Sequence, residues 1–209
     1  EPLNNPVKET DLTQGKTVYA INKLAGEELV RAYSKEYNQL NYSVLRYFNT
    51  YGPYQIAQFV IPKFIRNILN GKSPIVYGDG EQQRSYCFST DTARGTVSAL
   101  FCEKANDRTI NIGNSEALIS LKDLAKLVIE LCGKEDEINV KTKNSFKDTD
   151  RSAHREINAR YCDTEIAKNV LGFEPMVSLR EGIKSFIEHG VIHPKWATSD
   201  RDYTIDDSL

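Results

Sequence analysis

The stretch Val18-Tyr19-Ala20-Ile21-Asn22-Lys23 places a phenol and an ammonium four residues apart, at the start of a predicted helix that runs from about Val18 to Tyr37. Four residues make about one helical turn, so Tyr19 and Lys23 share one face of this helix. The apolar positions lie well round the axis from that face, which predicts that the helix is held from behind and that the pair lines a cleft. These apolar positions are Ile21, Ala25, Leu29 and Ala32.

A tyrosine beside a fixed ammonium can act as a base, because an opposite charge nearby favours the phenolate. Such a tyrosine can take the proton of a hydroxyl while hydride leaves the same carbon. The alternative is a surface Tyr and Lys that happen to lie one turn apart, and on spacing alone this alternative is the more common one. The choice between the two therefore depends on the rest of the chain.

Several further blocks follow in a fixed order over nearly the whole chain. They are Leu24-Ala25-Gly26-Glu27, the strand-like residues 42–49, Tyr51-Gly52-Pro53, residues 60–64, residues 77–86, Asp91, Asn111-Ile112-Gly113 and Leu171-Gly172-Phe173. Together with the Tyr-Lys pair, these blocks resemble the extended short-chain dehydrogenase/reductases, the NAD-dependent epimerases, dehydratases and decarboxylases of nucleotide sugars. The resemblance implies an α/β fold: the C-terminal part of a Rossmann-like doubly wound sheet, with a small α/β substrate-binding domain.

The resemblance also divides the chain into two portions. Residues 1–55 and 89–115 are expected to form a partial NAD-binding portion, and residues 56–88 and 116–209 a substrate-binding portion. A complete family member carries, before the Tyr-Lys pair, a βαβαβ half with a Gly-rich turn for the pyrophosphate. The turn Gly78-Asp79-Gly80 lacks the third glycine and opens no predicted helix. No Ser precedes Ser34 to act as the family's upstream catalytic Ser or Thr, so we expect the C-terminal two-thirds of an enzyme.

The cofactor contacts are implied by the resemblance alone. Lys23 would hold the nicotinamide ribose of NAD and favour the phenolate of Tyr19, which would take the hydroxyl proton as hydride passes from a sugar carbon to NAD. Phe48, near the end of the predicted strand 42–48, would pack near the nicotinamide.

Three residues are predicted to contact the substrate, a nucleotide-diphosphate sugar: Asn49, Val60 and Arg84. Asn49 follows the predicted strand at its carboxyl end, where open α/β sheets bind ligands. The alternative for Asn49 is a turn residue ahead of Gly52-Pro53. The planar guanidinium of Arg84 suits a diphosphate, and its alternative is a solvated surface arginine.

The polar segment 144–163 is long for a loop, which is common at functional sites. By resemblance it contributes a second arginine to the diphosphate, either Arg151 or Arg155.

The remaining periodic segments carry structural signals. We expect a helix over residues 62–69 that turns Phe64, Ile65, Ile68 and Leu69 inward. A helix beginning at Asp91 is expected to carry Ala93, Val97, Leu100 and Phe101 on one face, and the resemblance implies that this helix packs on the cofactor portion. Helices over residues 121–131 and 179–189 are predicted from the caps Ser120-x-x-Asp123 and Ser178-x-x-Glu181.

Composition excludes several classes of function. The formal net charge of -2 gives no sign of nucleic-acid binding. The four cysteines include no Cys-x-x-Cys, so we expect no zinc site and no disulfide framework, and a reduced cytoplasmic setting. No apolar run approaches the ~18 residues of a membrane span. His189 and His193 are separated by Gly190, so no metal site is expected. A homodimer is expected by resemblance.

The leading interpretation is part of an NAD-dependent nucleotide-sugar epimerase/dehydratase that transiently oxidises a sugar hydroxyl. Epimerisation, loss of water and loss of carbon dioxide all stay open as the later step. The alternative is a non-catalytic nucleotide-sugar-binding remnant, or a subunit that needs a separate cofactor-binding half. In either case the 209-residue chain alone is expected to be inactive.

Overall fold

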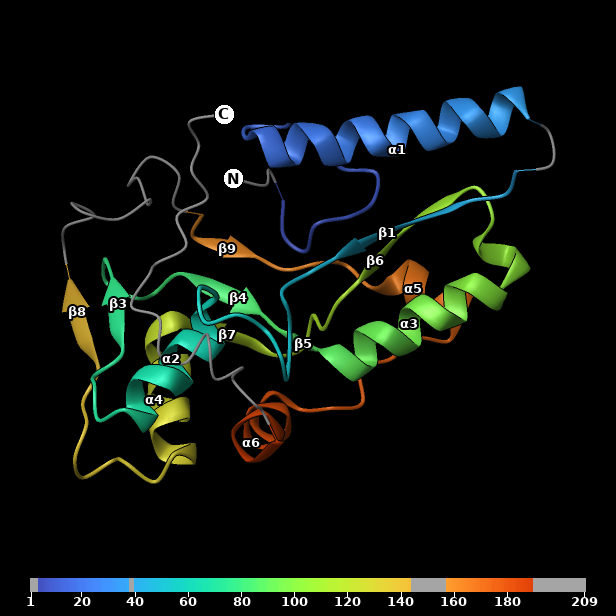
Figure 1. Cartoon of the computed structure of the whole chain (residues 1–209). Helices are drawn as coiled ribbons and strands as arrows, with labels where there is room; N and C mark the ends of the chain where they lie inside the picture. The colour runs from blue at the N-terminus through green and yellow to red at the C-terminus, as the bar shows by residue number, and fades with distance from the viewer. Residues whose placement is uncertain (1–3, 38–39, 144–156, 190–209) are drawn as a thin grey trace.

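The computed structural model describes residues 4–37, 40–143 and 157–189 of the chain (Figure 1). Its α-helices are α1 (Val18–Glu36), α2 (Val60–Leu69), α3 (Ser89–Phe101), α4 (Leu121–Leu131), α5 (Glu165–Leu171) and α6 (Leu179–His189), with a 3-10 turn at Glu103–Ala105. Its strands are β1 (Ser43–Tyr47), β2 (Thr50–Tyr51), β3 (Ile75–Tyr77), β4 (Gln83–Ser85), β5 (Cys87–Phe88), β6 (Arg108–Ile112), β7 (Leu118–Ser120), β8 (Lys141–Lys143) and β9 (Ala159–Arg160).

A parallel pair of strands, β1 and β6, forms the centre of one end of the molecule. The two strands pair in register from Ser43 opposite Arg108 to Tyr47 opposite Ile112. Helix α1 lies along one side of this pair, and α3 and α5 lie along the other (Figure 1). Helix on strand on helix is the layering of a doubly wound α/β sheet, so the expected α/β class is confirmed.

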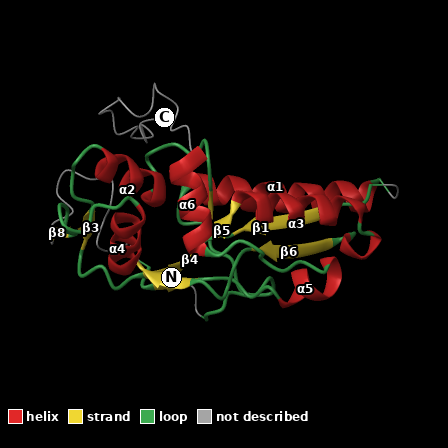
Figure 2. Ribbon diagram, turned by 90° about the horizontal axis from the view of Figure 1, so that it is seen from below, coloured by secondary structure: helices red, strands yellow, loops and turns green. Residues whose placement is uncertain are grey.

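The other end of the molecule holds α2, α4 and the short strands β3 and β8 (Figure 2). Strand β3 pairs with β8 in parallel, and β4 lies between the antiparallel β7 and the parallel β9. The two-residue strands β2 and β5 pair in parallel and join the two ends. Because β2 follows β1 after two residues, the chain passes directly from one end to the other at Phe48 and Asn49.

The buried apolar side chains form two separate clusters. The larger is built mainly by α2, α4 and α6 around buried residues such as Ile68, Leu124, Val128, Ile183 and Phe186. The smaller is Cys87, Ala99, Ala105, Ile110, Ile112, Ala167 and Phe173. Helix α5 packs on β6 and α3 and so belongs with the smaller cluster. The division of the chain into a cofactor and a substrate portion stays a prediction.

The predicted caps of α4 and α6 are both confirmed. Ser120 Oγ accepts a hydrogen bond from the amide of Asp123 at 3.0 Å. Ser178 Oγ accepts from the amide of Glu181 at 3.2 Å, and the Glu181 carboxylate accepts from the amide of Ser178 at 3.1 Å, which completes a reciprocal capping box. Each helix begins directly after its capping serine.

Helix α3 has one exposed and one buried face. Val97, Leu100 and Phe101, on the predicted apolar face, are 55%, 76% and 80% exposed, so the described residues leave this face uncovered, and its packing on a cofactor portion stays a prediction. The buried positions include Asp91 and Gly95. The Asp91 carboxylate accepts hydrogen bonds from the amides of Met176 and Val177, both at 3.0 Å. A Cβ at Gly95 would lie only 3.0 Å from the Phe173 ring, so glycine permits this close approach.

Two packing predictions are wrong. Leu69, expected inside, is 53% exposed at the end of α2, whereas Phe64, Ile65 and Ile68 are buried as expected. The stripe Ile21, Ala25, Leu29 and Ala32 on α1 is exposed along its whole length. The half-buried side of α1 is mixed instead: it carries Ala20 and Leu24 together with Glu27, Arg31 and Ser34. None of the described helices is both long and apolar enough to cross a membrane.

Candidate functional site

An open pocket of about 900 Å³ lies where the carboxyl end of β1 meets the beginnings of α1, α2 and α3. Four of the predicted site residues line it: Tyr19, Asn49, Val60 and Arg84. They come from α1, the segment after β1, α2 and β4, which lie far apart in the sequence. Its volume falls in the range of roughly 300–1,000 Å³ that is usual for ligand pockets. The fold therefore gathers these side chains around one space large enough for a small molecule.

Tyr19 and Lys23 lie together at the rim of this pocket. The Lys23 Nζ atom lies 5.5 Å from the centroid of the Tyr19 ring, within the range of a cation–π contact. The Tyr19 side chain is 72% exposed and lines the pocket, whereas Lys23 is not among the lining residues. The cation is thus beside the phenol and leaves its pocket side accessible.

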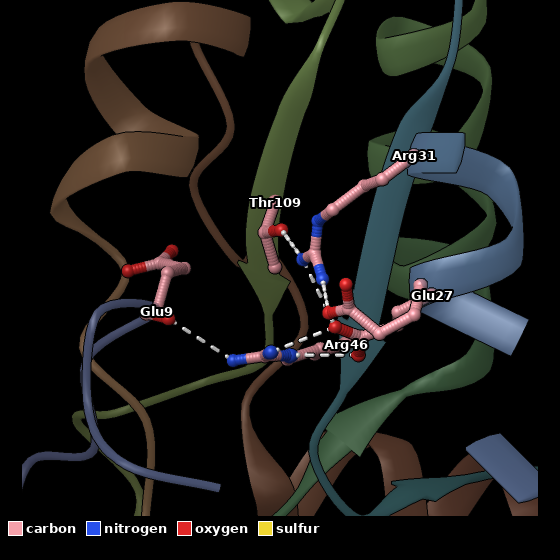
Figure 3. Close-up of polar contacts among 6 residues, drawn as sticks. Glu9, Glu27, Arg31, Arg46 and Thr109 are labelled. Carbon is pink, nitrogen blue, oxygen red and sulfur yellow. Dashed lines mark hydrogen bonds and ion pairs between the residues drawn. The ribbon is translucent and has the colours of Figure 1, made fainter. Parts of the chain in front are cut away.

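A polar network holds the middle of α1 against β1 (Figure 3). The Glu27 carboxylate accepts hydrogen bonds from Arg46 Nε at 2.9 Å and Arg46 Nη2 at 2.8 Å, and from Arg31 Nη2 at 3.2 Å. The hydrogen bonds from Arg46, together with the two guanidinium charges, hold the pKa of the Glu27 carboxyl below its usual value despite partial burial. Glu27 is therefore a charged, largely covered anchor of the helix that carries Tyr19.

Asn49 is both a turn residue and a pocket residue, so the two readings of this position do not exclude each other. Its φ of 41° lies in the left-handed region, which asparagine tolerates better than most residues. Its side-chain amide donates to the carbonyl of Ser85 at 2.8 Å, and its own carbonyl accepts from the amide of Cys87 at 3.2 Å. These bonds fix the turn between β1 and β2 and keep the side chain at the pocket wall.

Arg84 lies on β4, the middle strand of its three-stranded sheet. It is half-buried, lines the pocket and donates from Nη1 to the Gln83 carbonyl at 2.7 Å. In register it lies opposite Ile119 on β7 and Arg160 on β9. A guanidinium on a paired strand offers a directed fork of donors to an anion in the pocket.

Phe48 faces away from the pocket residues that flank it. Its side chain lies against Gly113, where an added Cβ would be 3.0 Å from Phe48 Cβ. Tyr47 and Asn49 line the pocket, and Phe48 does not. The predicted contact of Phe48 with NAD stays a prediction. Arg151 and Arg155 lie outside the described residues, as does His193.

The sequence interpretation missed several side chains of the pocket. Among them are Tyr47, Gln55, Gln58, Phe59 and Thr96. The Tyr47 hydroxyl lies 3.0 Å from Thr96 Oγ1 and so joins β1 to α3 at the pocket wall. The one sequence feature that could have indicated this tyrosine is its position directly before the predicted site residues Phe48 and Asn49.

The histidine, cysteine and acidic side chains of the described residues are scattered, and two of the cysteine thiols are buried. The described residues contain no group of three or more His, Cys, Asp or Glu side chains that could hold a metal ion. Burial raises the pKa of the Cys87 thiol to about 11 and that of Cys162 to about 12. Both thiols are therefore protonated at neutral pH and unsuited to act as nucleophiles.

Comparison with known proteins places the chain among nucleotide-sugar enzymes. Residues 1–186 match the family described as GDP-mannose 4,6 dehydratase. The chain is 30% identical over 190 residues to a putative UDP-glucose 4-epimerase of Methanocaldococcus jannaschii, covering 90% of this chain and 57% of that protein. It is 31% identical over 194 residues to dTDP-glucose 4,6-dehydratase 1 of Escherichia coli, covering 90% and 51% respectively. The chain thus spans about half the length of these curated relatives.

Solved structures agree with this placement. UDP-glucuronic acid 4-epimerase from Bacillus cereus, in complex with UDP-glucuronic acid and NAD, superposes with a TM-score of 0.78 at 28% identity, covering 90% of this chain and 57% of that one. UDP-glucose 4-epimerase from Thermotoga maritima, with UDP-glucose, gives a TM-score of 0.77 at 31% identity, covering 88% and 56%.

Proposed function

Since the chain belongs to the GDP-mannose 4,6-dehydratase family, within the extended short-chain dehydrogenase/reductases, we propose that it supplies the proton-transferring residues and the substrate side of an NAD-dependent nucleotide-sugar epimerase or dehydratase. Its relatives are epimerases and dehydratases of UDP- and dTDP-sugars. The observation that carries the proposal is the meeting of Tyr19, Asn49, Val60 and Arg84 around one pocket.

In this proposal Tyr19 takes the proton of a sugar hydroxyl. Its accessible phenol at the pocket and the Lys23 ammonium 5.5 Å from its ring support this role. NAD, when bound, supplies the hydride acceptor. Lys23 and Tyr19 at the rim of the pocket suit the hydroxyls of a nicotinamide ribose, and Lys23 is the residue that would bind them.

The substrate in this proposal is a nucleotide-diphosphate sugar. Arg84 binds the diphosphate through its guanidinium fork, and Asn49 hydrogen-bonds the sugar or the diphosphate. Val60, the first residue of α2, contributes an apolar contact. Arg151 or Arg155 supplies a second arginine. A fork of fixed geometry binds phosphate oxygens in a way that a lysine would not.

The dinucleotide-binding half is proposed to pack against the outer edge of β1. Among the described residues β1 pairs only with β6. Beside it lies an apolar recess lined by Leu45, Val97, Leu100 and Phe101 among others, and the last three are exposed. A parallel strand with one partner and an uncovered apolar flank suits a sheet that continues into further strands.

A homodimer and a cytoplasmic location complete the proposal. The exposed apolar side chains of α1, including Val18, Ile21, Leu29 and Tyr33, support an interface on this helix. The four free cysteines support a reducing compartment.

The first experiment replaces the proposed base. In the complete enzyme, with the dinucleotide-binding half present, Tyr19→Phe is expected to lower kcat by roughly 10²–10⁴-fold, the usual contribution of general acid–base catalysis. The matched control is Tyr33→Phe, which alters an exposed tyrosine on the same helix that does not line the pocket. An unchanged rate in Tyr19→Phe would show that another group takes the proton.

The second experiment separates the enzyme from a non-catalytic binding module. The alternative is favoured by one observation: the described pocket contains residues suited to the diphosphate but no Gly-rich dinucleotide turn. The 209-residue chain alone is expected to bind a UDP-sugar measurably in calorimetry and NAD only weakly. Arg84→Met should weaken the UDP-sugar binding. Binding without turnover in the complete protein would favour the module, and low-micromolar NAD binding with turnover by this chain alone would contradict the proposed division.

A further inference from the structure

The less exposed side of α1 combines Ala20 and Leu24 with three polar side chains, those of Glu27, Arg31 and Ser34, although a helix on a sheet usually packs through an apolar stripe. None of the residues of α1 is buried. Its most covered ion pair among the described residues joins Glu27 to Arg46 on β1, and their side chains are 12% and 20% exposed. Two parallel hydrogen bonds join them, from Arg46 Nε at 2.9 Å and Nη2 at 2.8 Å.

Further hydrogen bonds extend this pair to neighbouring elements (Figure 3). Arg31, one turn after Glu27, donates to the Glu27 carboxylate and also to Thr109 Oγ1 on β6 at 3.0 Å. Arg46 Nη1 donates to the Glu9 carbonyl at 3.1 Å, and the Glu9 carboxylate accepts from the amide of Asn111 at 2.8 Å. The helix is thereby joined to both strands of the parallel pair and to the segment before it.

Such a contact constrains orientation in a way that the hydrophobic effect by itself does not. Apolar burial is non-directional, and on α1 it is slight, because none of its residues is buried. A two-point bond between carboxylate and guanidinium is directional at both ends. It therefore constrains the rotation of α1 about its axis and its displacement along β1.

The pair joins the two elements that carry Tyr19 and lead to Asn49, at a position outside the pocket. Tyr19 precedes Glu27 by eight residues on α1, about 12 Å along a helix axis. Arg46 precedes Asn49 by three residues at the end of β1. A shift of α1 relative to β1 would therefore change the distance between the phenol of Tyr19 and the side chain of Asn49.

We propose that the Glu27–Arg46 pair is the positioning element that sets the Tyr19 phenol relative to the substrate residues at the end of β1. The inference rests on the proposed function, because it concerns the proton transfer assigned to Tyr19. Glu27 and Arg46 do not line the pocket, so they act through Tyr19 and not on the substrate.

The decisive variant is Glu27→Gln in the complete enzyme, which keeps the size of the side chain and removes its charge. A misplacement of about 1 Å can cost roughly 10²-fold in rate, so kcat is expected to fall about 10- to 100-fold while KM changes less than about 3-fold. Arg46→Lys keeps the charge and loses the fork, so its kcat should lie between those of the wild type and Glu27→Gln.

The chain offers a matched control in the pair Arg180–Glu130. This pair also has two hydrogen bonds, from Nη1 and Nη2, both at 2.9 Å, but it joins α6 to α4 at the surface. Glu130→Gln removes a carboxylate of the same kind without touching α1. Its kcat is expected to stay within about 2-fold of the wild type, as for a surface ion pair far from the chemistry. An equal loss in both variants would overturn the proposal.

A double variant tests whether Glu27 acts through Tyr19. If it does, Tyr19→Phe with Glu27→Gln should be no slower than Tyr19→Phe alone, because the group being positioned is already gone. Losses that multiply would overturn the positioning role. An unchanged rate in Tyr19→Phe alone would instead reject the proposed function. A loss in Tyr19→Phe with none in Glu27→Gln would reject the positioning role only.

A measurement on the chain itself removes the dependence on activity. The ¹³Cζ resonance of Tyr19, assigned by its disappearance in Tyr19→Phe, reports the surroundings of the phenol at fixed pH. Glu27→Gln and Arg46→Lys should displace this resonance, and Glu130→Gln should not. If neither of the two α1 variants displaces it in a folded chain, the pair does not position the phenol. Arg46→Lys serves for this decision should Glu27→Gln fail to fold.

Discussion

Helices α4 and α1 contact the rest of the chain through different chemistry. Helix α4 buries Leu121, Leu124, Ala125, Val128 and Ile129 against α2 and α6. Helix α1 is longer, with 19 residues against 11, yet buries none. One helix is held by removing apolar surface from water, the other by a few hydrogen-bonded charges.

The difference shows which part of the chain exposes apolar surface among the described residues. The larger apolar cluster closes on itself, since its buried side chains come from α2, α4, α6 and the strands between them. The apolar stripe of α1 and the outer face of α3 remain exposed. An exposed stripe of this kind marks an interaction surface more often than a solvated one. The apolar surface that the described residues leave exposed therefore lies on α1, the helix that carries the proposed catalytic tyrosine, and on α3.

The largest loss of stability is expected for a substitution in the larger apolar cluster. Phe186 is 1% exposed in that cluster, and Phe186→Ala should lower the free energy of unfolding by about 3–5 kcal/mol. Leu29→Ala on α1, where the side chain is 59% exposed, should change it by less than about 0.5 kcal/mol. Urea titrations of the chain at low micromolar concentration compare the two variants. A large loss in Leu29→Ala would mean that the α1 face is covered in solution.

The same contrast explains what the sequence could predict. Helix α4 was predicted with its observed bounds, because Ser120 caps it and its apolar period faces a partner within the chain. The stripe beginning at Ile21 has an equally regular period, but it is exposed. A hydrophobic period indicates that some surface covers a helix and does not say whether that surface belongs to the same chain.

The residues that line the pocket were also predicted only in part. The family resemblance indicated Tyr19, Asn49, Val60 and Arg84, and all four line one space. No local pattern predicts that residues so far apart meet, because the fold brings them together. Tyr47 was missed because the resemblance indicated its neighbours Phe48 and Asn49. The left-handed turn at Asn49 brings both Tyr47 and Asn49 to the pocket wall, and no alternation of an extended strand predicts such a turn.

The next largest loss of stability is expected at the Glu27–Arg46 pair, which joins α1 to β1. Arg46→Met removes both hydrogen bonds to Glu27 and leaves a largely covered carboxylate with Arg31. A hydrogen bond to a charged group contributes about 1.5–3 kcal/mol, so a loss of about 2 kcal/mol is expected for this partly exposed pair. Hydrogen exchange should show the loss as faster exchange of the α1 amides, with α4 unchanged. Equal acceleration in both helices would mean that the two ends unfold as one unit.

Acid should weaken the same contact. The folded chain lowers the pKa of the Glu27 carboxyl from its ordinary 4.5, chiefly through the hydrogen bonds from Arg46. The contribution of a group with a lowered pKa is complete above its unfolded pKa and is lost as the pH falls through the folded value. Wild type should therefore lose more stability than Glu27→Gln between pH 5 and pH 3, by an amount below the loss in Arg46→Met, because protonation keeps part of the hydrogen bonding.

Hydrogen exchange of the α1 amides at pH 7, 5, 4 and 3, corrected for the intrinsic exchange rate at each pH, measures this difference. Above about pH 6 the gap between wild type and Glu27→Gln should be constant, because the carboxyl is ionised in both the folded and unfolded states. Glu130→Gln is the control, since its carboxylate is exposed and its pair with Arg180 is screened by solvent. Parallel curves for wild type and Glu27→Gln over the whole range would show that Glu27 is not held as an ion.

The smallest effect compares two helix caps. Ser120 Oγ accepts from the amide of Asp123 at 3.0 Å, and Thr17 Oγ1 accepts from the amide of Ala20 at 3.1 Å at the start of α1. Removing either cap by Ala substitution should cost about 1 kcal/mol of helix stability. Because α4 is part of the closed cluster, Ser120→Ala should lower the free energy of global unfolding. Because α1 is held by few contacts, Thr17→Ala should only speed hydrogen exchange in its first turns and leave the urea midpoint in place. A shift of that midpoint in Thr17→Ala as large as in Ser120→Ala would show that the helix bearing Tyr19 unfolds together with the apolar core.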